Sequence, residues 1–92
     1  MIRTFRHKGV RRFFEKSDPR GVGASQVDRL RRILDRLDAA TKSEDMNIPG
    51  FGFHGLSGQR KGTRAVSVSG NWRITFRMVG GDVFDIDLED YH

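Results

Sequence analysis

The sequence predicts an α+β fold in which an N-terminal strand and two helices pack on one face of a mainly antiparallel sheet. Two helical patterns of apolar residues occupy the first 40 residues, and strand-like alternation of apolar and polar residues fills the last third. A chain of 92 residues provides one hydrophobic core of modest stability and has no room for a separate cofactor domain. We therefore expect residues 1–92 to fold as a single domain.

The N-terminal part of the chain contains the first strand and the two helices. Residues 1–5 have the character of a short strand, and apolar residues at the helical i, i+3, i+4 spacing predict an amphipathic helix over residues 7–16. The second helix is expected to begin at Ser25, which would cap it together with Asp28 three residues later. The apolar positions are Val10, Phe13 and Phe14 in the first helix and Val27, Leu30, Leu34 and Leu37 in the second.

Another face of the second helix carries an arginine stripe. Its members are Arg29, Arg32 and Arg36. One interpretation is a solvated helix face on which charges are paired within the helix, as Asp28–Arg32 and Arg31–Asp35. The other interpretation is a contact with RNA. The sequence leaves both open.

The last third is a β-meander, a series of neighbouring strands joined by short turns. Its alternating apolar residues are Val66 and Val68, then Trp72, Ile74, Phe76 and Met78, then Phe84, Ile86 and Leu88. A three-residue loop at residues 80–82 keeps the apolar residues of the last two strands on one face, whereas a two-residue turn mixes the faces. The expected cross-strand pairs are Phe76–Ile86, Ile74–Leu88, Arg77–Asp85 and Arg73–Glu89. One sheet face is therefore expected to be apolar and covered by the helices, and the other to be polar and open.

Several residues able to carry out chemistry are expected on the open face. A loop over residues 42–53, which contains two glycines and a proline, delivers His54 to the sheet. Arg73 comes from the middle of a strand, and Asn71 lies near the end of the neighbouring strand. The end of that neighbouring strand consists of Asp90, Tyr91 and His92. The loop and strand that precede the strand of Arg73 contribute Arg60, Lys61 and Arg64.

The charge distribution favours a polyanionic partner. Residues 1–40 contain eleven Lys or Arg against five Asp or Glu, whereas residues 81–92 contain five acidic residues and no Lys or Arg. Such a basic half is typical of nucleic-acid binding, although ordinary solvated helix faces would give the same composition.

The composition also excludes some kinds of site. There is no cysteine, which removes disulfides, thiol nucleophiles and Cys-ligated metals, and which fits a reducing cytoplasm. The three histidines, His7, His54 and His92, lack the spacing of metal ligands. The N-terminus lacks the apolar core of a secretion signal, and no apolar run approaches the roughly 18 residues of a membrane span. We expect a protein with no metal, no cofactor and no membrane partner.

Taken in order, the motifs resemble the HigB plasmid-maintenance toxins of the RelE superfamily. The resemblance covers the whole chain and is carried by the combination of motifs more than by any one of them. The matching residues are Met1-Ile2-x2-Phe5, Leu56-x-Gly58-x3-Gly62, Val66-x-Val68-x2-Asn71-Trp72-Arg73-Ile74-x-Phe76 and Asp90-Tyr91-His92. The sequence departs from some relatives at Ser57, Ser67 and Ser69, where those relatives carry basic residues; Arg60, Lys61 and Arg64 are candidates to compensate.

The resemblance implies a RelE-like microbial RNase fold and a cofactor-free endoribonuclease that cuts mRNA in the ribosomal A site. In this family the 2′-hydroxyl of the RNA attacks the adjacent phosphate, so the site needs a proton acceptor, cations that stabilise the phosphorane, and a proton donor for the 5′-oxygen. It also implies a HigA-like antitoxin as partner, with operator DNA bound only through that antitoxin. Alternatives are a non-catalytic RNA- or ribosome-binding module of the same fold, and a protein-interaction domain.

Each candidate residue has a role implied by the resemblance and a plainer alternative. His54 is a candidate general base or a loop hydrogen-bonding residue, and Arg73 is a candidate phosphate-stabilising cation or the partner of Glu89. His92 is expected to act as an acid or to contact phosphate. Tyr91 is expected to stack on a base or transfer a proton, unless it caps the core. Asp90 either orients a histidine or binds a base edge, or is a plain strand-end carboxylate. The expected RNA contacts are Arg60, Lys61, Arg64 and Asn71.

Overall fold

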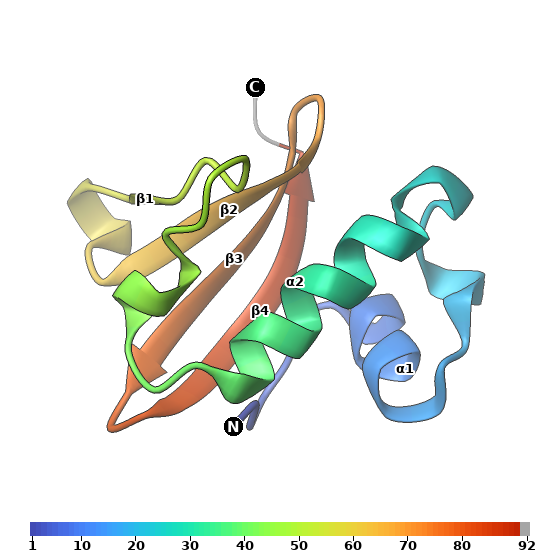
Figure 1. Ribbon diagram of the computed structural model, residues 1–92, viewed down its shortest axis with the longest axis horizontal. Coiled ribbons are helices and arrows are strands. Elements are labelled where there is room, and N and C mark those ends of the chain that lie inside the picture. Colours follow the sequence, from blue (N-terminus) through green and yellow to red (C-terminus); the bar gives the residue numbers. More distant parts are fainter. Residues whose placement is uncertain (91–92) are drawn as a thin grey trace.

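A computed structural model describes residues 1–90, which form an α+β fold (Figure 1). The two α-helices are α1 (Lys8–Lys16) and α2 (Val27–Ala39). The strands are β1 (His54–Gly55), β2 (Thr63–Ser69), β3 (Trp72–Val79) and β4 (Asp82–Asp90). The strands pair antiparallel in the order β1-β2-β3-β4, which confirms the predicted meander.

The N-terminal segment lies beside β4 and runs parallel to it. The predicted strand over residues 1–5 is reduced to two isolated bridges, Ile2 with Val83 and Phe5 with Ile86. The sheet is therefore mainly antiparallel, as expected, and its one parallel neighbour within residues 1–90 comes from this short segment.

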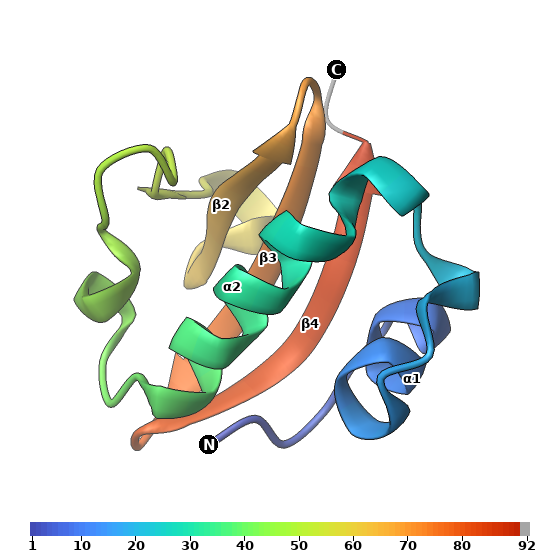
Figure 2. The ribbon, with the colours of Figure 1, turned by 45° about the vertical axis from the view of Figure 1, so that its right-hand side comes forward.

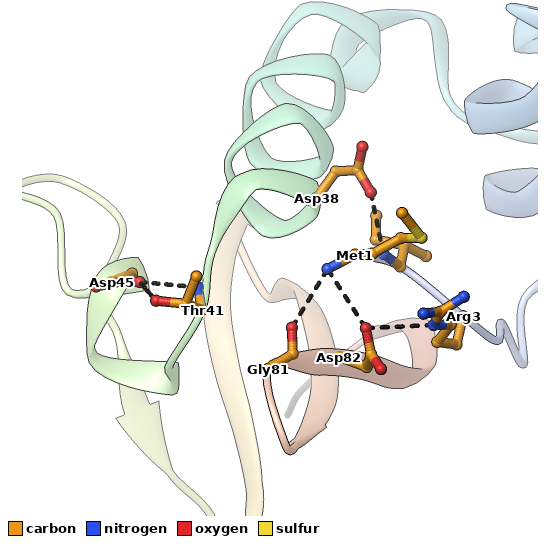
Figure 3. A network of polar contacts seen from close by, with 8 residues as sticks. Met1, Arg3, Asp38, Thr41, Asp45, Gly81 and Asp82 are labelled. Atoms are coloured by element: carbon orange, nitrogen blue, oxygen red, sulfur yellow. Dashed lines mark hydrogen bonds and ion pairs between the residues drawn. The ribbon is translucent and has the colours of Figure 1, made fainter.

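Polar contacts hold the N-terminal segment between α2 and the turn that joins β3 to β4 (Figure 3). The amino group of Met1 lies 3.8 Å from the carboxylate of Asp82, and Nε of Arg3 lies 3.2 Å from the same carboxylate. The backbone N–H of Ile2 donates to Oδ1 of Asp38 on α2 at 3.0 Å. The start of the chain thus connects the sheet to the helix that covers it.

Helix α2 lies along one face of the sheet, while α1 lies beside the β4 edge (Figures 1 and 2). The buried core between α2 and the sheet contains side chains from α1, α2, the loop before β1 and strands β2 to β4. Its fully buried large members include Leu30, Ile33, Leu34, Leu37, Met46, Ile74, Phe76 and Ile86. Trp72, predicted to belong to this apolar layer, is 38% exposed because it sits at the end of the sheet. Across residues 1–90, neither helix combines the length and apolar character that crossing a membrane requires.

The bounds of α1 confirm the helix predicted over residues 7–16, whereas the cap predicted for α2 is wrong. Helix α1 is capped by His7, whose Nδ1 accepts a hydrogen bond from the N–H of Val10 at 3.1 Å. Ser25 does not cap α2, because it lies inside a 3₁₀ turn over Ala24–Gln26 that leads directly into the helix. Asp28 nevertheless lies in the first turn, where a negative charge interacts favourably with the helix dipole.

The arginine stripe on α2 is not uniform. Arg29 is half-buried and donates from Nε and Nη2 to the carbonyl of Ser67, and from Nη2 to the carbonyl of Gly50 at 2.7 Å. Its guanidinium also lies over the ring of Phe51, 4.6 Å from the centroid. Arg29 is therefore a structural residue that joins α2 to β2 and to the loop before His54.

The ion pairs predicted for that helix face, Asp28–Arg32 and Arg31–Asp35, are not among those formed by residues 1–90. The guanidinium of Arg31 instead lies over the ring of Phe13, 4.8 Å from the centroid. Arg32 and Arg36 are exposed. The helix face is thus solvated at these two positions and anchored at Arg29.

The register of β3 and β4 corrects the predicted loop length. The turn has two residues, Gly80 and Gly81, both with positive φ (59° and 87°), as a type I′ hairpin turn requires. A bulge then shifts the register between Thr75 and Arg77, and Asp85 adopts a left-handed φ of 59°. The extra residue was predicted in the loop between the two strands, but it lies within β4, as the bulge.

The bulge explains why the predicted pairs are only partly correct. Ile74 faces Leu88 and Arg73 faces Glu89, as predicted, because these pairs lie beyond the bulge. Arg77 faces Phe84 and not Asp85, although its Nη1 still reaches the Asp85 carboxylate at 3.5 Å. The predicted pair Phe76–Ile86 is not formed, because the bulge lies there. Phe84, predicted on the apolar face, shares the polar face with Arg77, and Val83 takes the core position instead.

Candidate active site

The sheet face opposite α2 carries rows of polar side chains that cross the strands. One row contains His54, Thr75 and Asp87, with the buried Ala65 between His54 and Thr75. The neighbouring row contains Ser67, Arg73 and Glu89. These residues alternate along their strands with core residues such as Ile74 and Leu88, so they lie on the other face. The predicted polar face therefore exists, and its pattern of residues follows from strand alternation.

A cleft of about 370 Å³ lies on this face. Its walls come from the N-terminal segment, the residues between β1 and β2, and the adjoining parts of β2, β3 and β4. The residues that line it are Arg6, Gln59, Arg60, Lys61, Thr63, Thr75, Arg77 and Asp85. Four of the eight side chains are cations and one is a carboxylate, so the cleft is suited to an anion.

Next to this cleft, three side chains form a hydrogen-bonded network. Arg60 donates from both terminal nitrogens to the two carboxylate oxygens of Glu89, and Thr75 donates its hydroxyl to the same carboxylate. The hydrogen bonds from Arg60, and then that from Thr75, hold the pKa of Glu89 below its usual range against the opposing effect of burial. Glu89 is therefore ionised at neutral pH and orients Arg60 at the cleft.

The predicted general base, His54, is exposed on the edge strand β1. Its Nδ1 lies 3.0 Å from the carbonyl oxygen of Gly52. Since a carbonyl only accepts, Nδ1 carries the hydrogen in this geometry, and in the neutral ring Nε2 has the lone pair. The loop before β1 thus selects the tautomer of a histidine on the polar face.

Arg73 does not form the ion pair with Glu89 that was the plainer of its two predicted alternatives. Its Nη1 donates to the carbonyls of Gly70 and Trp72, at 2.9 and 3.1 Å, so the guanidinium is turned toward the β2–β3 turn. The alternative ion pair with Glu89 is absent from the described contacts, because Arg60 occupies that carboxylate. The side chain is held by backbone carbonyls at the end of the sheet.

Asn71 and Asp90 lie at that same end. Asn71 is exposed in the β2–β3 turn, and Asp90 is the last residue of β4, directly opposite Trp72. Tyr91 and His92 lie outside the described residues. Two strands, β2 and β3, separate the backbones of His54 on β1 and Asp90 on β4. The described candidates thus surround the polar face and do not form one compact cluster of backbone neighbours.

Of the three cations predicted to reach the open face from the loop and β2, two line the cleft. These are Arg60 and Lys61. Arg64 faces Phe76 in the register and therefore lies on the opposite sheet face from Thr63 and Ala65. Its expected position on the open face is wrong, because side chains alternate and Arg64 has the parity of the core residue Val66.

Sequence reasoning missed Arg6 and the involvement of Thr75 and Arg77 in the cleft. Thr75 and Arg77 alternate with core residues along β3, and this signal was sufficient to place them on the open face. Arg6 has no comparable local signal, since its place depends on the pairing of the N-terminal segment with β4. Within residues 1–90, no three His, Asp or Glu side chains gather where they could hold a metal ion.

A sheet covered by helices on one face and polar on the other is consistent with the RelE-like toxin fold, and comparison with known proteins agrees. Residues 3–92 match the family described as RelE-like toxin of type II toxin-antitoxin system HigB. The chain is 41% identical over 92 residues to "Endoribonuclease HigB" of Proteus vulgaris, covering 100% of both chains. It is 30% identical over 93 residues to "Toxin HigB-1" of Vibrio cholerae serotype O1, covering 99% of this chain and 98% of that protein.

The chain belongs to the HigB-like toxins of type II toxin–antitoxin systems. Membership implies an antitoxin protein as its partner.

Proposed function

We propose that this toxin is a metal-independent endoribonuclease that cleaves mRNA in the A site of the ribosome and thereby inhibits translation and growth. The observation that carries the proposal is the polar sheet face, which combines a cleft lined by four cations with a histidine whose Nδ1 is held by a backbone carbonyl. The name of the Proteus vulgaris relative, an endoribonuclease identical at 41% of positions along the whole chain, supports the same activity.

In the proposed reaction the RNA supplies its own nucleophile, the 2′-hydroxyl next to the scissile phosphate. Nε2 of His54 takes the proton of that hydroxyl, and Arg73 stabilises the charge that develops on the phosphorane. His92 donates a proton to the 5′-oxygen as the P–O bond to it breaks, Tyr91 stacks on a base or assists proton transfer, and Asp90 orients a histidine. The products are a 2′,3′-cyclic phosphate and a 5′-hydroxyl.

Only Nη1 of Arg73 donates to the carbonyls of Gly70 and Trp72. The N–H groups on Nε and Nη2 are the donors proposed for the phosphate, and the carbonyls hold the guanidinium in place. Asn71, in the same turn, is placed to contact the nucleotide beside it.

The partners follow from this activity. The substrate is mRNA on the small ribosomal subunit, which places the toxin in the cytoplasm. The antitoxin is HigA-like, and operator DNA is contacted only through it. A rival function, a non-catalytic RNA- or ribosome-binding module, uses the same cationic face but cleaves nothing.

Cleavage of a translated mRNA, with identification of the RNA ends, separates these functions. The parent protein should leave 2′,3′-cyclic phosphate or 3′-phosphate ends, and cleavage should persist in a transition-metal chelator that spares ribosomal Mg²⁺. His92→Ala and Arg73→Ala should each lower the rate by at least about 10²-fold while the proteins stay folded and pellet with ribosomes. Arg12→Ala, a change of an exposed arginine on α1, is the control and should cleave at the parental rate.

Other results would contradict the proposal. Ends carrying a 3′-hydroxyl indicate a different reaction, and ribosome binding without cleavage supports the rival function. Parental rates for both His92→Ala and Arg73→Ala would show that the catalytic residues lie elsewhere. In cells, expression of the chain alone should arrest growth, and co-expression of the neighbouring antitoxin gene should restore it.

A further inference from the structure

We propose that the cleft lined by Arg6, Lys61 and Arg77 binds a backbone phosphate of the RNA other than the one that is cut. Arg6 and Lys61 are the phosphate ligands, and Arg60 is held beside them by Glu89. The inference rests on the proposed function, because it takes RNA as the ligand, and it adds a second phosphate subsite on the polar face.

The backbone around Arg6 is firmly attached to the bulge in β4. The N–H of Arg6 donates to the carbonyl of Ile86 at 2.7 Å, and the N–H of Asp85 donates to the hydroxyl of Thr4 at 2.8 Å. Phe5 also forms a bridge with Ile86. The position of the exposed Arg6 side chain at the rim of the cleft is therefore set by tertiary contacts of its backbone, which a side-chain substitution leaves in place.

The cations of the cleft differ in how they are neutralised. Arg77 pairs with Asp85 at 3.5 Å, and Arg60 pairs with Glu89. Among the contacts of residues 1–90, neither Arg6 nor Lys61 forms an ion pair. Two like charges at one cleft repel each other, and an anion bound between them removes that repulsion.

The chemistry of the lining favours a phosphate over a base or an apolar ligand. All eight lining residues are polar or charged and none of the eight is aromatic, so hydrogen bonds and charge dominate the binding that the cleft offers. Arginine presents several donors in a planar fork that matches phosphate oxygens, and Gln59 and Thr63 add neutral donors. Contacts of this kind position a nucleic acid without reading its sequence.

The Arg77 side of the cleft lies away from Arg73, to which stabilisation of the phosphorane is assigned. Arg77 is four residues from Arg73 on β3, which corresponds to roughly 13 Å along an extended strand, and the guanidinium of Arg73 is turned toward the β2–β3 turn. The other edge of the cleft reaches Thr75, whose hydroxyl binds Glu89 beside Asp90, so the phosphate in the cleft is a near neighbour of the scissile phosphate on the same RNA strand. The cleft is thus expected to contribute to RNA affinity and register, with little effect on the chemical step.

The test compares Arg6→Gln and Lys61→Gln with the control Arg12→Gln, which removes the same charge from an exposed position on α1 outside the cleft. The probe is a short fluorescent 2′-O-methyl oligoribonucleotide, which lacks the nucleophile and cannot be cut. Its affinity is measured by fluorescence anisotropy over a range of KCl concentrations, after thermal melts have confirmed that each variant is folded.

We expect the slope of log K against log salt to decrease in magnitude by about 0.7 for each phosphate contact removed in Arg6→Gln and Lys61→Gln. Affinity should fall several-fold in both variants and remain parental in Arg12→Gln. On translating ribosomes the two cleft variants should raise KM and leave kcat within about twofold of the parent, as expected for a contact made equally in the ground and transition states.

Three results would overturn the inference. The first is an unchanged slope and affinity in Arg6→Gln and Lys61→Gln. The second is an equal change in Arg12→Gln, which indicates a general charge effect, and the third is a parent protein that does not bind the oligoribonucleotide even at low salt. A parent that binds with the expected salt dependence but cleaves no mRNA would refute the proposed function and leave the phosphate subsite standing.

Discussion

Replacing Arg29 with alanine removes the side chain that joins α2 to β2 and to the loop before His54. Arg29→Ala deletes three hydrogen bonds, two to the carbonyl of Ser67 at 3.2 and 3.0 Å and one to that of Gly50 at 2.7 Å. It also removes the guanidinium from the ring of Phe51. The substitution therefore loosens the packing of α2 against the loop and uncovers the ring of one core residue, Phe51, while it deletes no core side chain.

The magnitude follows from these contacts. A hydrogen bond from a charged donor contributes about 1.5–3 kcal/mol and a partly exposed cation–π contact about 0.5–1 kcal/mol. Since the contacts share one half-buried side chain and do not add, we expect a loss of about 2–3 kcal/mol in the free energy of unfolding. For a domain of this size the loss corresponds to a decrease in Tm of roughly 10–20 °C. Circular dichroism melts measure it directly.

Arg32→Ala is the matched control, because Arg32 lies on the same helix but is exposed and forms none of the ion pairs recorded for residues 1–90. Its melting temperature should stay within about 4 °C of the parent, since exposed substitutions usually change stability by less than about 0.5 kcal/mol. Arg29→Lys should be intermediate, because an ammonium cannot reach both carbonyls as the guanidinium fork does. Equal melting temperatures for Arg29→Ala and Arg32→Ala would refute the reasoning.

Three further predictions concern stability. Gly9→Ala should destabilise by about 1–3 kcal/mol in urea unfolding, because its Cβ would lie 2.2 Å from the carbonyl oxygen of Gly21; a parental midpoint would contradict that close packing. Trp72→Ala should cost only about 1–2 kcal/mol in the same assay, less than a buried aromatic, because the ring is 38% exposed; a loss above about 3 kcal/mol would show that it packs as core. The hydrogen bonds from Arg20 lower the pKa of Asp18 to about 2, below its value in the unfolded chain, so Asp18 stabilises the fold above the unfolded pKa and loses this effect as pH falls toward 2. Asp18→Asn should therefore lower Tm at neutral pH and have a smaller effect near pH 2; an equal decrease at both pH values would argue against the ion pair.

The parts of the fold that depend on local periodicity were predictable from the sequence. The spacing of Val10 and Phe13 placed α1, and the alternation around Ile74 and Leu88 placed β3 and β4 with the correct pairing beyond the bulge. These signals work because a helix or strand exposes one face to the core wherever it lies in the molecule. The polar face, and the presence of Arg73 and Thr75 on it, followed from the same alternation.

Features that depend on several segments at once were not predictable in this way. The choice between a three-residue loop and a two-residue turn with a bulge could not be made from alternation, because both solutions give the same faces beyond residue 85. Arg29 and Arg32 occupy the same stripe in the sequence, but only Arg29 meets the carbonyls of Gly50 and Ser67. That difference is made by the loop packed against α2.

The sequence by itself determined both α-helices, the three long strands, the polar face and the family, because strand alternation, helical spacing and the combined motifs can be read along the chain. The tertiary structure alone decided which cations share the cleft. Arg6 joins Lys61 there because the N-terminal segment pairs with β4. Arg60 is oriented there because it, and not Arg73, pairs with Glu89, whose carboxylate also accepts the hydroxyl of Thr75 on the neighbouring strand. The competition between Arg60 and Arg73 for one carboxylate depends on distances in space, and a charge pattern along the chain contains no such distances.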